Sequence, residues 1–382
     1  MKAWTIIAAG GLMAGCSSNP HATSGGGMPT GYETPAASAP GLCAVWTVRP
    51  LDLSALPPPS STTSLAAETD GRGGVTLSAV PSAGSPVAMA IASDGSSGPV
   101  VTLAPPAPGD AGAAPFVLQV EAAPGGTWVT TWDVAGEGNG PPTILRHDSQ
   151  GDLSQTYPWL FSASSDDDYA VCAVGQDDSI GCAGGNDVGW YLPGQMTPTV
   201  VGGDASGPSG VWSNGVFTFG NASAPGIESI ASDGSFVDFP AASVLASGDV
   251  LVPGVGGRSA MVLTTSGNPP SPVLDVASTA TPPQTFLFDP PGAYLMTAVP
   301  RAASNGALAA WVADGSAPGS GSTAWFTEVA PDGATGATIE LATELVPLTN
   351  LVVAGSSDGD VLVAVGWNAG IRWGRVATCS GS

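Results

Sequence analysis

The chain has 382 residues, and its 54 glycines and 36 prolines accompany a charged fraction of only 10%. A hydrophobic fraction of 43% excludes a disordered chain, and the many turn-forming residues favour short strands over helices, which predicts an all-β fold. Lysine and arginine number 8 against 31 aspartates and glutamates, a formal net charge of −23. Because such a surface repels phosphate backbones, we expect no nucleic-acid partner.

The N-terminus has the plan of a bacterial export signal. Lys2 supplies a positive charge, residues 3–11 are apolar but too short to span a bilayer, and the sequence LMAGC follows at 12–16. This ending resembles the lipobox of bacterial lipoproteins, with methionine where leucine is commonest. The resemblance implies that residues 1–15 are a signal peptide and that Cys16 carries diacylglycerol and a further acyl chain such as palmitate. An ordinary secretory signal is the alternative.

Residues 16–41 lack strand or helix periodicity and are rich in glycine, proline, serine and alanine. This composition predicts a flexible tether between the anchor and a folded body at 42–382. In the lipoprotein family, Ser17 after the lipidated cysteine would permit transfer to the outer membrane. The expected location is therefore the bacterial cell envelope, with the membrane contacted through the lipid.

The hexapeptide IASDGS occurs twice, at 91–96 and at 230–235. Each copy places Asp-Gly between apolar runs, which predicts the turn of a β-hairpin. Three looser relatives share this plan: TILRHDSQGDLSQTY, AMVLTTSGNPPSPVLDV and WFTEVAPDGATGATIEL.

A second pattern precedes the hairpins, namely a turn followed by alternating small and apolar residues. Its seven copies begin at Gly74, Gly126, Asp168, Asn214, Gly248, Asn305 and Gly359. Units of this length with about four short strands are typical of propeller blades. We therefore predict a β-propeller of about seven blades, with six or eight as alternatives; hairpins of a β-sandwich are the rival interpretation.

The two ends of the body should complete each other. The segment AVWTVRPLDL at 44–53 has no partner upstream, and the last unit ends early with GIRWGRVATC. A closed ring needs both segments in one blade, which also removes exposed sheet edges.

Besides Cys16, four cysteines remain, an even number that suits an oxidising compartment. Ring closure would bring Cys43 to Cys379, and a hairpin would place Cys172 opposite Cys182. Without a Cys-x-x-Cys motif, we expect both pairs to be structural disulfides rather than redox-active ones.

One segment has a family likeness. Cys172-Ala173-Val174, Asp178-Ser179-Ile180-Gly181 and the run from Cys182 to Gly189 resemble a repeat of the regulator-of-chromosome-condensation family. Here Ser179 replaces the turn glycine and Ala183 a tryptophan. The resemblance implies a seven-bladed propeller and a cysteine-paired hairpin, and it carries no nucleotide-exchange function.

Catalytic signatures are scarce. The two histidines are His21, in the tether, and His147, which beside Asp148 we interpret as part of a solvated pair on a hairpin turn. P-loop and HExxH motifs are absent, and we assign no catalytic residue and no cofactor apart from calcium. Oxygen ligands for Ca²⁺ could come from Asp166, Asp167 and Asp168, with Asp177 and Asp178 nearby; solvated turns are the alternative.

Tryptophan offers one further candidate site. Trp190 and Tyr191 follow a glycine-rich loop, and exposed aromatic rings there could stack on sugars. Trp128, Trp311 and Trp367 alternate with small apolar residues and are expected in the core.

These features predict a lipid-anchored, non-enzymatic propeller that serves as a platform for envelope proteins or glycans. Two alternatives remain: a surface enzyme that acts on polysaccharide through paired carboxylates, and a structural surface protein.

Overall fold

The computed structural model describes residues of the folded body and leaves out several connecting segments. The described residues are 42–58, 64–69, 74–80, 85–92, 94–106, 116–133, 142–160, 171–175, 177–184, 187–202, 211–213, 216–220, 226–231, 235–239, 250–253, 259–266, 271–278, 282–287, 293–301, 306–314, 321–344, 348, 350–355, 361–368 and 371–380. The expected signal peptide and tether lie outside them. Among the described residues, no helix is long and apolar enough to cross a membrane.

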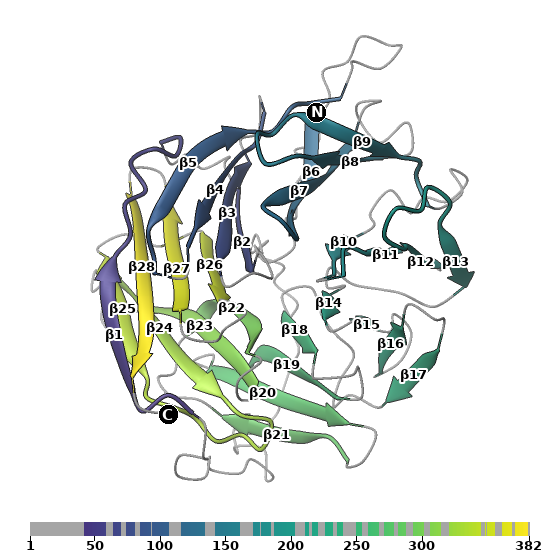
Figure 1. The fold of residues 1–382 in the computed structure, drawn as a ribbon. Helices are drawn as coiled ribbons and strands as arrows, with labels where there is room; N and C mark the ends of the chain where they lie inside the picture. The colour runs from purple at the N-terminus through teal and green to yellow at the C-terminus, as the bar shows by residue number, and fades with distance from the viewer. Residues whose placement is uncertain are drawn as a thin grey trace, which may run out of the picture.

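The described strands form seven four-stranded antiparallel sheets, which surround a common centre as the blades of a propeller (Figure 1). Blade 1 comprises β2 (Ser64–Thr69), β3 (Val75–Val80), β4 (Val87–Ile91) and β5 (Ser97–Thr102). Blade 2 comprises β6 (Phe116–Ala123), β7 (Thr127–Asp133), β8 (Thr143–His147) and β9 (Leu153–Tyr157). Blade 3 comprises β10 (Val171–Val174), β11 (Ile180–Gly184), β12 (Asp187–Tyr191) and β13 (Thr199–Gly202).

The remaining blades follow the same order from the centre outward. Blade 4 comprises β14 (Val211–Ser213), β15 (Val216–Gly220), β16 (Ile227–Ala231) and β17 (Phe236–Phe239). Blade 5 comprises β18 (Val250–Pro253), β19 (Ser259–Ser266), β20 (Ser271–Ser278) and β21 (Gln284–Leu287). Blade 6 comprises β22 (Ala293–Arg301), β23 (Gly306–Asp314), β24 (Ser322–Val329) and β25 (Ile339–Glu344).

Blade 7 closes the ring with strands from both ends of the body. Its order is β26 (Asn350–Gly355), β27 (Val361–Asn368), β28 (Ile371–Ser380) and β1 (Val45–Pro50). In the antiparallel pairing of β1 with β28, Trp46 lies opposite Cys379. The predictions of an all-β propeller and of a blade shared by the first and last strands are confirmed.

The predicted repeat register is correct only in part. Five of the seven unit starts lead into the second strand of a blade, but those at Asp168 and Gly248 lead into the first strands β10 and β18. Neighbouring blades differ in the lengths of their connections, and both strand types alternate small and apolar residues. The sequence pattern therefore did not distinguish the two strands.

The core consists of apolar layers between adjacent blades. Trp46 and Trp373 of blade 7, for example, pack with Leu308 and Phe326 of blade 6 in one buried cluster. Trp128 and Trp311 are buried, as predicted; the side chain of Trp367 lies outside the description. Because each blade packs on both faces, alternate residues of a strand face different neighbours and both sets are buried.

The two copies of the repeated hexapeptide lie at equivalent positions, and their described residues share one backbone hydrogen bond. They join the third and fourth strands of blades 1 and 4. In the first copy, the amide of Ala92 donates to the carbonyl of Ser96 (2.9 Å) and the amide of Gly95 donates to that of Ala92 (2.7 Å). In the second, the amide of Ala231 donates to the carbonyl of Ser235 (2.9 Å). The turns at 148–152 and 330–334 repeat both bonds between β8 and β9 and between β24 and β25.

The fourth position of this turn requires the left-handed backbone conformation. The φ angles of Gly95, Gly151 and Gly333 are +77°, +85° and +81°. Glycine adopts these angles without a steric penalty. The Asp-Gly signal therefore marks a defined three-residue hairpin loop.

Candidate functional site

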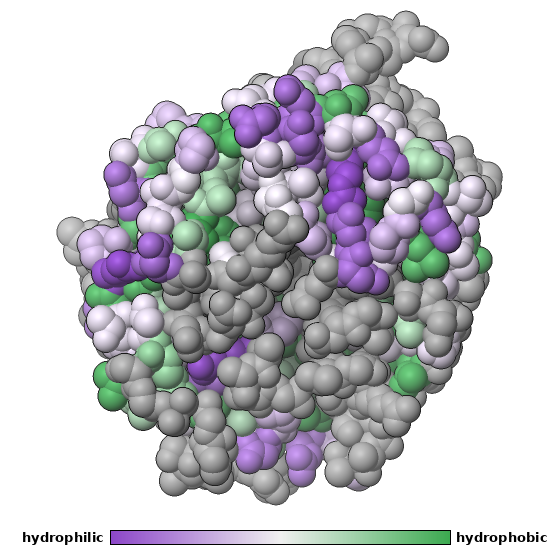
Figure 2. Space-filling view, viewed as in Figure 1, coloured by the Kyte–Doolittle hydropathy of each residue, from purple (hydrophilic) through white to green (hydrophobic). Residues whose placement is uncertain are grey.

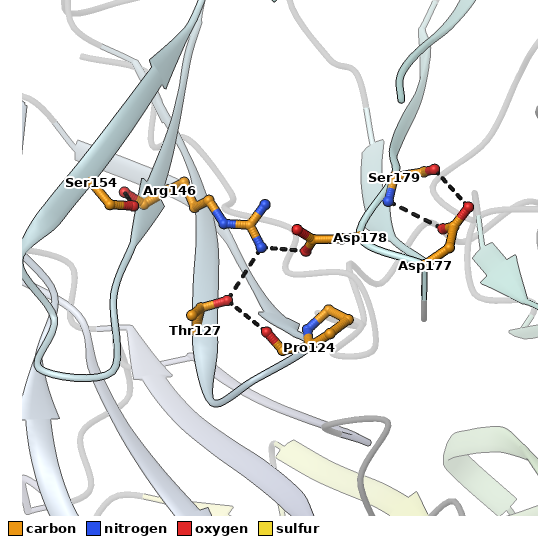
Figure 3. Close-up of polar contacts among 7 residues, drawn as sticks. All are labelled: Pro124, Thr127, Arg146, Ser154, Asp177, Asp178 and Ser179. Atoms are coloured by element: carbon orange, nitrogen blue, oxygen red, sulfur yellow. Dashed lines mark hydrogen bonds and ion pairs between the residues drawn. The ribbon is translucent and has the colours of Figure 1, made fainter. Parts of the chain in front are cut away.

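The seam between blades 2 and 3 holds a group of polar contacts around Arg146 and Asp178, close to the Cys172–Cys182 hairpin. Arg146 extends from β8, and its Nη2 donates to Asp178 Oδ1 in an ion pair and to Thr127 Oγ1 at 3.3 Å (Figure 3). Thr127 Oγ1 in turn donates to the carbonyl of Pro124 (3.0 Å). The pair thus connects the turn after β10 to the two middle strands of blade 2.

Asp178 has an unusual backbone conformation. It occupies the fourth position of the 175–179 turn with φ +76°, and among the described residues it alone combines a positive φ with a side chain. The same turn is capped by Asp177, whose Oδ1 accepts from the amide of Ser179 (3.1 Å) and whose Oδ2 accepts from its hydroxyl (2.9 Å). Asp178 replaces the usual glycine at a conformational cost, and its carboxylate forms a contact that glycine could not make.

Arg146 keeps its charge in the ion pair with Asp178. Burial acts to lower the pKa of Arg146, but hydrogen bonds to Asp178 and Tyr157 outweigh it and raise the pKa above its ordinary value. The guanidinium therefore stays charged at every pH of interest and does not transfer protons. Its chemical role here is to bind carboxylate and hydroxyl oxygens.

His147 lies in the core of blade 2, which corrects the interpretation of a solvated pair. Its side chain is buried, with Nε2 2.7 Å from Thr130 Oγ1 and Nδ1 3.3 Å from the carbonyl of Gly151. Trp132 Nε1 donates to the same Thr130 oxygen (2.6 Å). A proton on Nδ1 satisfies this chain, since Nε2 then accepts from the threonine. Burial lowers the pKa of His147, so the ring is neutral.

Trp190 and Tyr191 are also buried, which corrects the expectation of an exposed stacking surface. Their relative exposures are 2% and 1%. As consecutive residues of β12 they face opposite blades, and Trp190 packs with Phe217 and Phe219 of blade 4. Tyr191 lies beside Tyr157 of blade 2, with ring centroids 5.0 Å apart.

The phenol of Tyr191 is part of the seam rather than of an open surface. Its hydroxyl donates to the carbonyl of Pro158. Burial raises the pKa of Tyr191 to about 12, so the hydroxyl remains a donor at physiological pH.

Both predicted disulfides are present. The hairpin bridge joins Cys172 to Cys182, which are paired directly across β10 and β11. The closure bridge joins Cys43 to Cys379 across 336 residues. Gln119 of β6 also binds the backbone of Cys172: its Oε1 accepts from the amide (3.0 Å), and its Nε2 donates to the carbonyl.

The acidic residues do not form a single group around β10. Asp177 and Asp178 follow this strand, whereas Asp166, Asp167 and Asp168 precede it and lie outside the described residues. Within the described part of the chain, no three His, Cys, Asp or Glu side chains lie together as a metal site. A calcium role for residues 166–168 stays a prediction, as does lipid attachment at Cys16, which also lies outside the described residues.

The ion pair of Arg146 and Asp178 was missed at the sequence level. A signal for it was present, because Asp178 falls where related turns have glycine. Its partner, 32 residues earlier, could not be identified without the packing of adjacent blades.

Comparison with known proteins gives a fold and no family. No protein-family model and no curated protein matches the chain. Two structures of virginiamycin B lyase from Staphylococcus aureus are similar: one, of a catalytically inactive variant with quinupristin, has a TM-score of 0.53 at 14% identity. The other, with selenomethionine substituted, has a TM-score of 0.55 at 12% identity. Each likeness covers 88% of this chain and 100% of the lyase chain. At such identities the likeness shows the shared β-propeller fold alone.

Proposed function

We propose that the protein is a lipid-anchored propeller of the bacterial envelope, at the outer membrane, that serves as a non-enzymatic platform for an envelope protein or a glycan. The observation that carries the proposal is the use of the cysteines. Two disulfides occupy four of the five cysteines. The fifth, Cys16, is the one that ends the apolar leader.

Paired cysteines support export, because disulfides persist in oxidising compartments. The closure bridge supports it further, since it joins the residues just before β1 to the last strand, β28, and so holds the two ends of the body together. A body that is held by such a bridge suits a site outside the cytoplasm. Cys16, at the end of the lipobox, is then available for the thioether bond to lipid.

A platform role is supported by the bonds that the buried polar residues make. Arg146 binds Asp178, His147 binds Thr130, and Gln119 binds a backbone amide of the next blade. These bonds hold neighbouring blades or strands together and leave the groups occupied. A rigid ring of this kind presents its surface loops in fixed positions.

The similarity to virginiamycin B lyase does not lead us to propose a lyase activity. One of the two lyase structures is of an inactive variant in which a histidine is replaced by alanine. The histidine of the folded body of this chain, His147, is buried in bonds within its own blade. On the face drawn in Figure 2, hydrophilic and hydrophobic residues are interspersed over the described surface.

The test has two steps. Intact-mass measurement of the mature protein should show a chain that begins at Cys16 and carries lipid, and Cys16→Ser should abolish both the added mass and membrane association. In-cell cross-linking of wild type, with Cys16→Ser as the matched control, should then capture a stoichiometric envelope partner or a glycan. Hydrolysis of envelope polysaccharide by the purified protein would replace the platform role with an enzymatic one.

A further inference from the structure

Blade 7 lacks the turn that joins the third and fourth strands of the other blades. Its third strand, β28, ends near Ser380, and its fourth strand, β1, begins at Val45, opposite that end. The closure bridge lies at this break, with the Cα atoms of Cys43 and Cys379 5.7 Å apart. The disulfide thus provides the covalent link that a hairpin turn provides elsewhere.

The residues that precede β1 are bound to blade 6. The amide of Cys43 donates to Glu328 Oε2 (2.8 Å), and its carbonyl accepts from the amide of Ala337 (3.3 Å). Leu42 packs in a buried cluster with Ala330 and Ala334. The first residues of the body are therefore fixed before the edge strand begins.

The carboxylate that binds Cys43 is itself held in the core. Glu328 forms an ion pair with Arg301, and both side chains are almost completely buried. The Arg301 guanidinium lies 5.5 Å from the ring centre of Trp46, and Trp46 makes an edge contact with Phe326 at 5.0 Å. Detaching Cys43 would remove a hydrogen-bond donor from this buried carboxylate, which makes the attachment costly to break.

The residues after β1 are attached as well. The amide of Leu51 donates to the carbonyl of Gly374 (2.9 Å). Arg372 Nη1 donates to the carbonyls of Leu56 (2.9 Å) and Pro57 (3.1 Å). The segment 42–57, which we name the strap, is thus fixed on both sides of β1.

We propose that the strap carries tension from the membrane anchor into the ring and keeps β1 from peeling. An edge strand pulled from one end loses its hydrogen bonds one after another, which needs little force. In this protein a pull on the tether meets the closure bridge and the buried Glu328 contact before it reaches β1. Tension therefore passes covalently to β28 and through Glu328 to blade 6. The cellular role of the strap depends on the proposed lipid anchor.

Single-molecule pulling of the full chain tests the strap. One handle is placed within residues 17–41 and the other at Thr199, an exposed residue of β13. In the variant Cys43→Ser/Cys379→Ser, we expect an early step that releases the 16 residues of the strap, whose fully stretched length is about 55 Å at about 3.5 Å each; the extension is this length less the distance that the strap spans when folded. Wild type should lack this step.

Three further samples test the assignment of the early step. The variant Cys172→Ser/Cys182→Ser lacks the other disulfide and should show no early step. If the closure-bridge variant does not fold, wild-type molecules reduced after folding replace it. Adding Glu328→Gln to the closure-bridge variant should lower the force of the early step.

The outcomes separate the strap from the anchor. An early step in oxidised wild type would overturn the proposed role of the strap. So would the lack of an early step in the variant without the closure bridge. Because the handles replace the lipid, this result does not depend on lipidation, which the mass of the mature protein tests independently. An unlipidated Cys16 with a bridge-dependent early step would remove the proposed anchor and leave the mechanics of the strap intact.

Discussion

Replacing Gly151 with alanine should disrupt the contact between blades 1 and 2. Gly151 has φ +85° in the turn between β8 and β9, and its carbonyl accepts from the amide of Ala104 (3.0 Å). A Cβ at this position would overlap the carbonyl oxygen of Thr102 and lie 2.6 Å from Val101 Cγ1. The glycine is therefore required for its conformation and for the close approach of the next blade.

The cost of the left-handed conformation and the cost of the close approach between blades can be estimated separately. Gly126 has φ +69°, but a Cβ there would meet no atom within 4 Å. Gly126→Ala should thus cost only the left-handed conformation, about 1 kcal/mol. Gly151→Ala adds overpacking of about 1–3 kcal/mol, for a total of about 2–4 kcal/mol. The obstructing atom belongs to the backbone, so a side-chain rotation cannot relieve the clash.

Urea unfolding of the oxidised protein, followed by tryptophan fluorescence, measures both variants against wild type. The excess loss of unfolding free energy in Gly151→Ala over Gly126→Ala isolates the contact between the blades. Adding Val101→Ala to Gly151→Ala should recover only a small part of it, because the carbonyl of Thr102 remains. Equal losses in the two glycine variants would refute the reasoning.

Three further predictions follow from the disulfides, the buried histidine and the strained aspartate. Loss of the closure bridge should lower the unfolding free energy more than loss of the hairpin bridge. Loops of 336 and 10 residues correspond to about 6 and about 3 kcal/mol in the chain-entropy model. Unfolding of the two double-serine variants measures both losses, and a larger loss for the hairpin-bridge variant would contradict the prediction. Burial lowers the pKa of His147 below 6.5, so the unfolded chain binds the proton more strongly and the unfolding free energy should fall as the pH drops below about 6.5. His147→Gln should show a smaller loss between pH 7.5 and 5.5, and an unchanged loss would count against the buried neutral ring. Asp178→Ala should be less stable than Asp178→Gly by about 1 kcal/mol, because both lose the ion pair but only alanine retains the left-handed cost; equal melting temperatures would show that the turn carries no strain.

Local patterns predicted the parts of the fold that depend on local chemistry. The Asp-Gly turn at 91–96 sets its hairpin, because Gly95 adopts a positive φ and Asp94 Oδ1 accepts from the amide of Ser96. Closure of the ring followed from the unpaired segment at 44–53. The unit starts at Asp168 and Gly248 are not equivalent to the other five, since strand order within a blade depends on connections whose lengths vary.

The site was less predictable because its contacts are non-local. His147 is the last residue of β8 and precedes a turn, a position that predicts exposure; its burial depends on Thr130, in the neighbouring strand. The sequence predicted Trp190 and Tyr191 to be one exposed pair. Because side chains alternate between the two faces of β12, they lie in two different apolar layers between blades. Whether such residues are buried depends on the adjacent blade, which no local pattern contains.

The few cations of this acidic chain show how the ring is held. Five of its seven arginines are described, and each reaches a neighbouring blade or the connection that leads to it. They are Arg49 beside Gly95, Arg146 with Asp178, Arg301 over Trp46, Arg372 with Leu56, and Arg375 with Leu341. With a net charge of −23, repulsion among the carboxylates opposes closure of the ring. Arginines at the seams place positive charge between neighbouring blades and so offset this repulsion. The rest of the surface remains acidic.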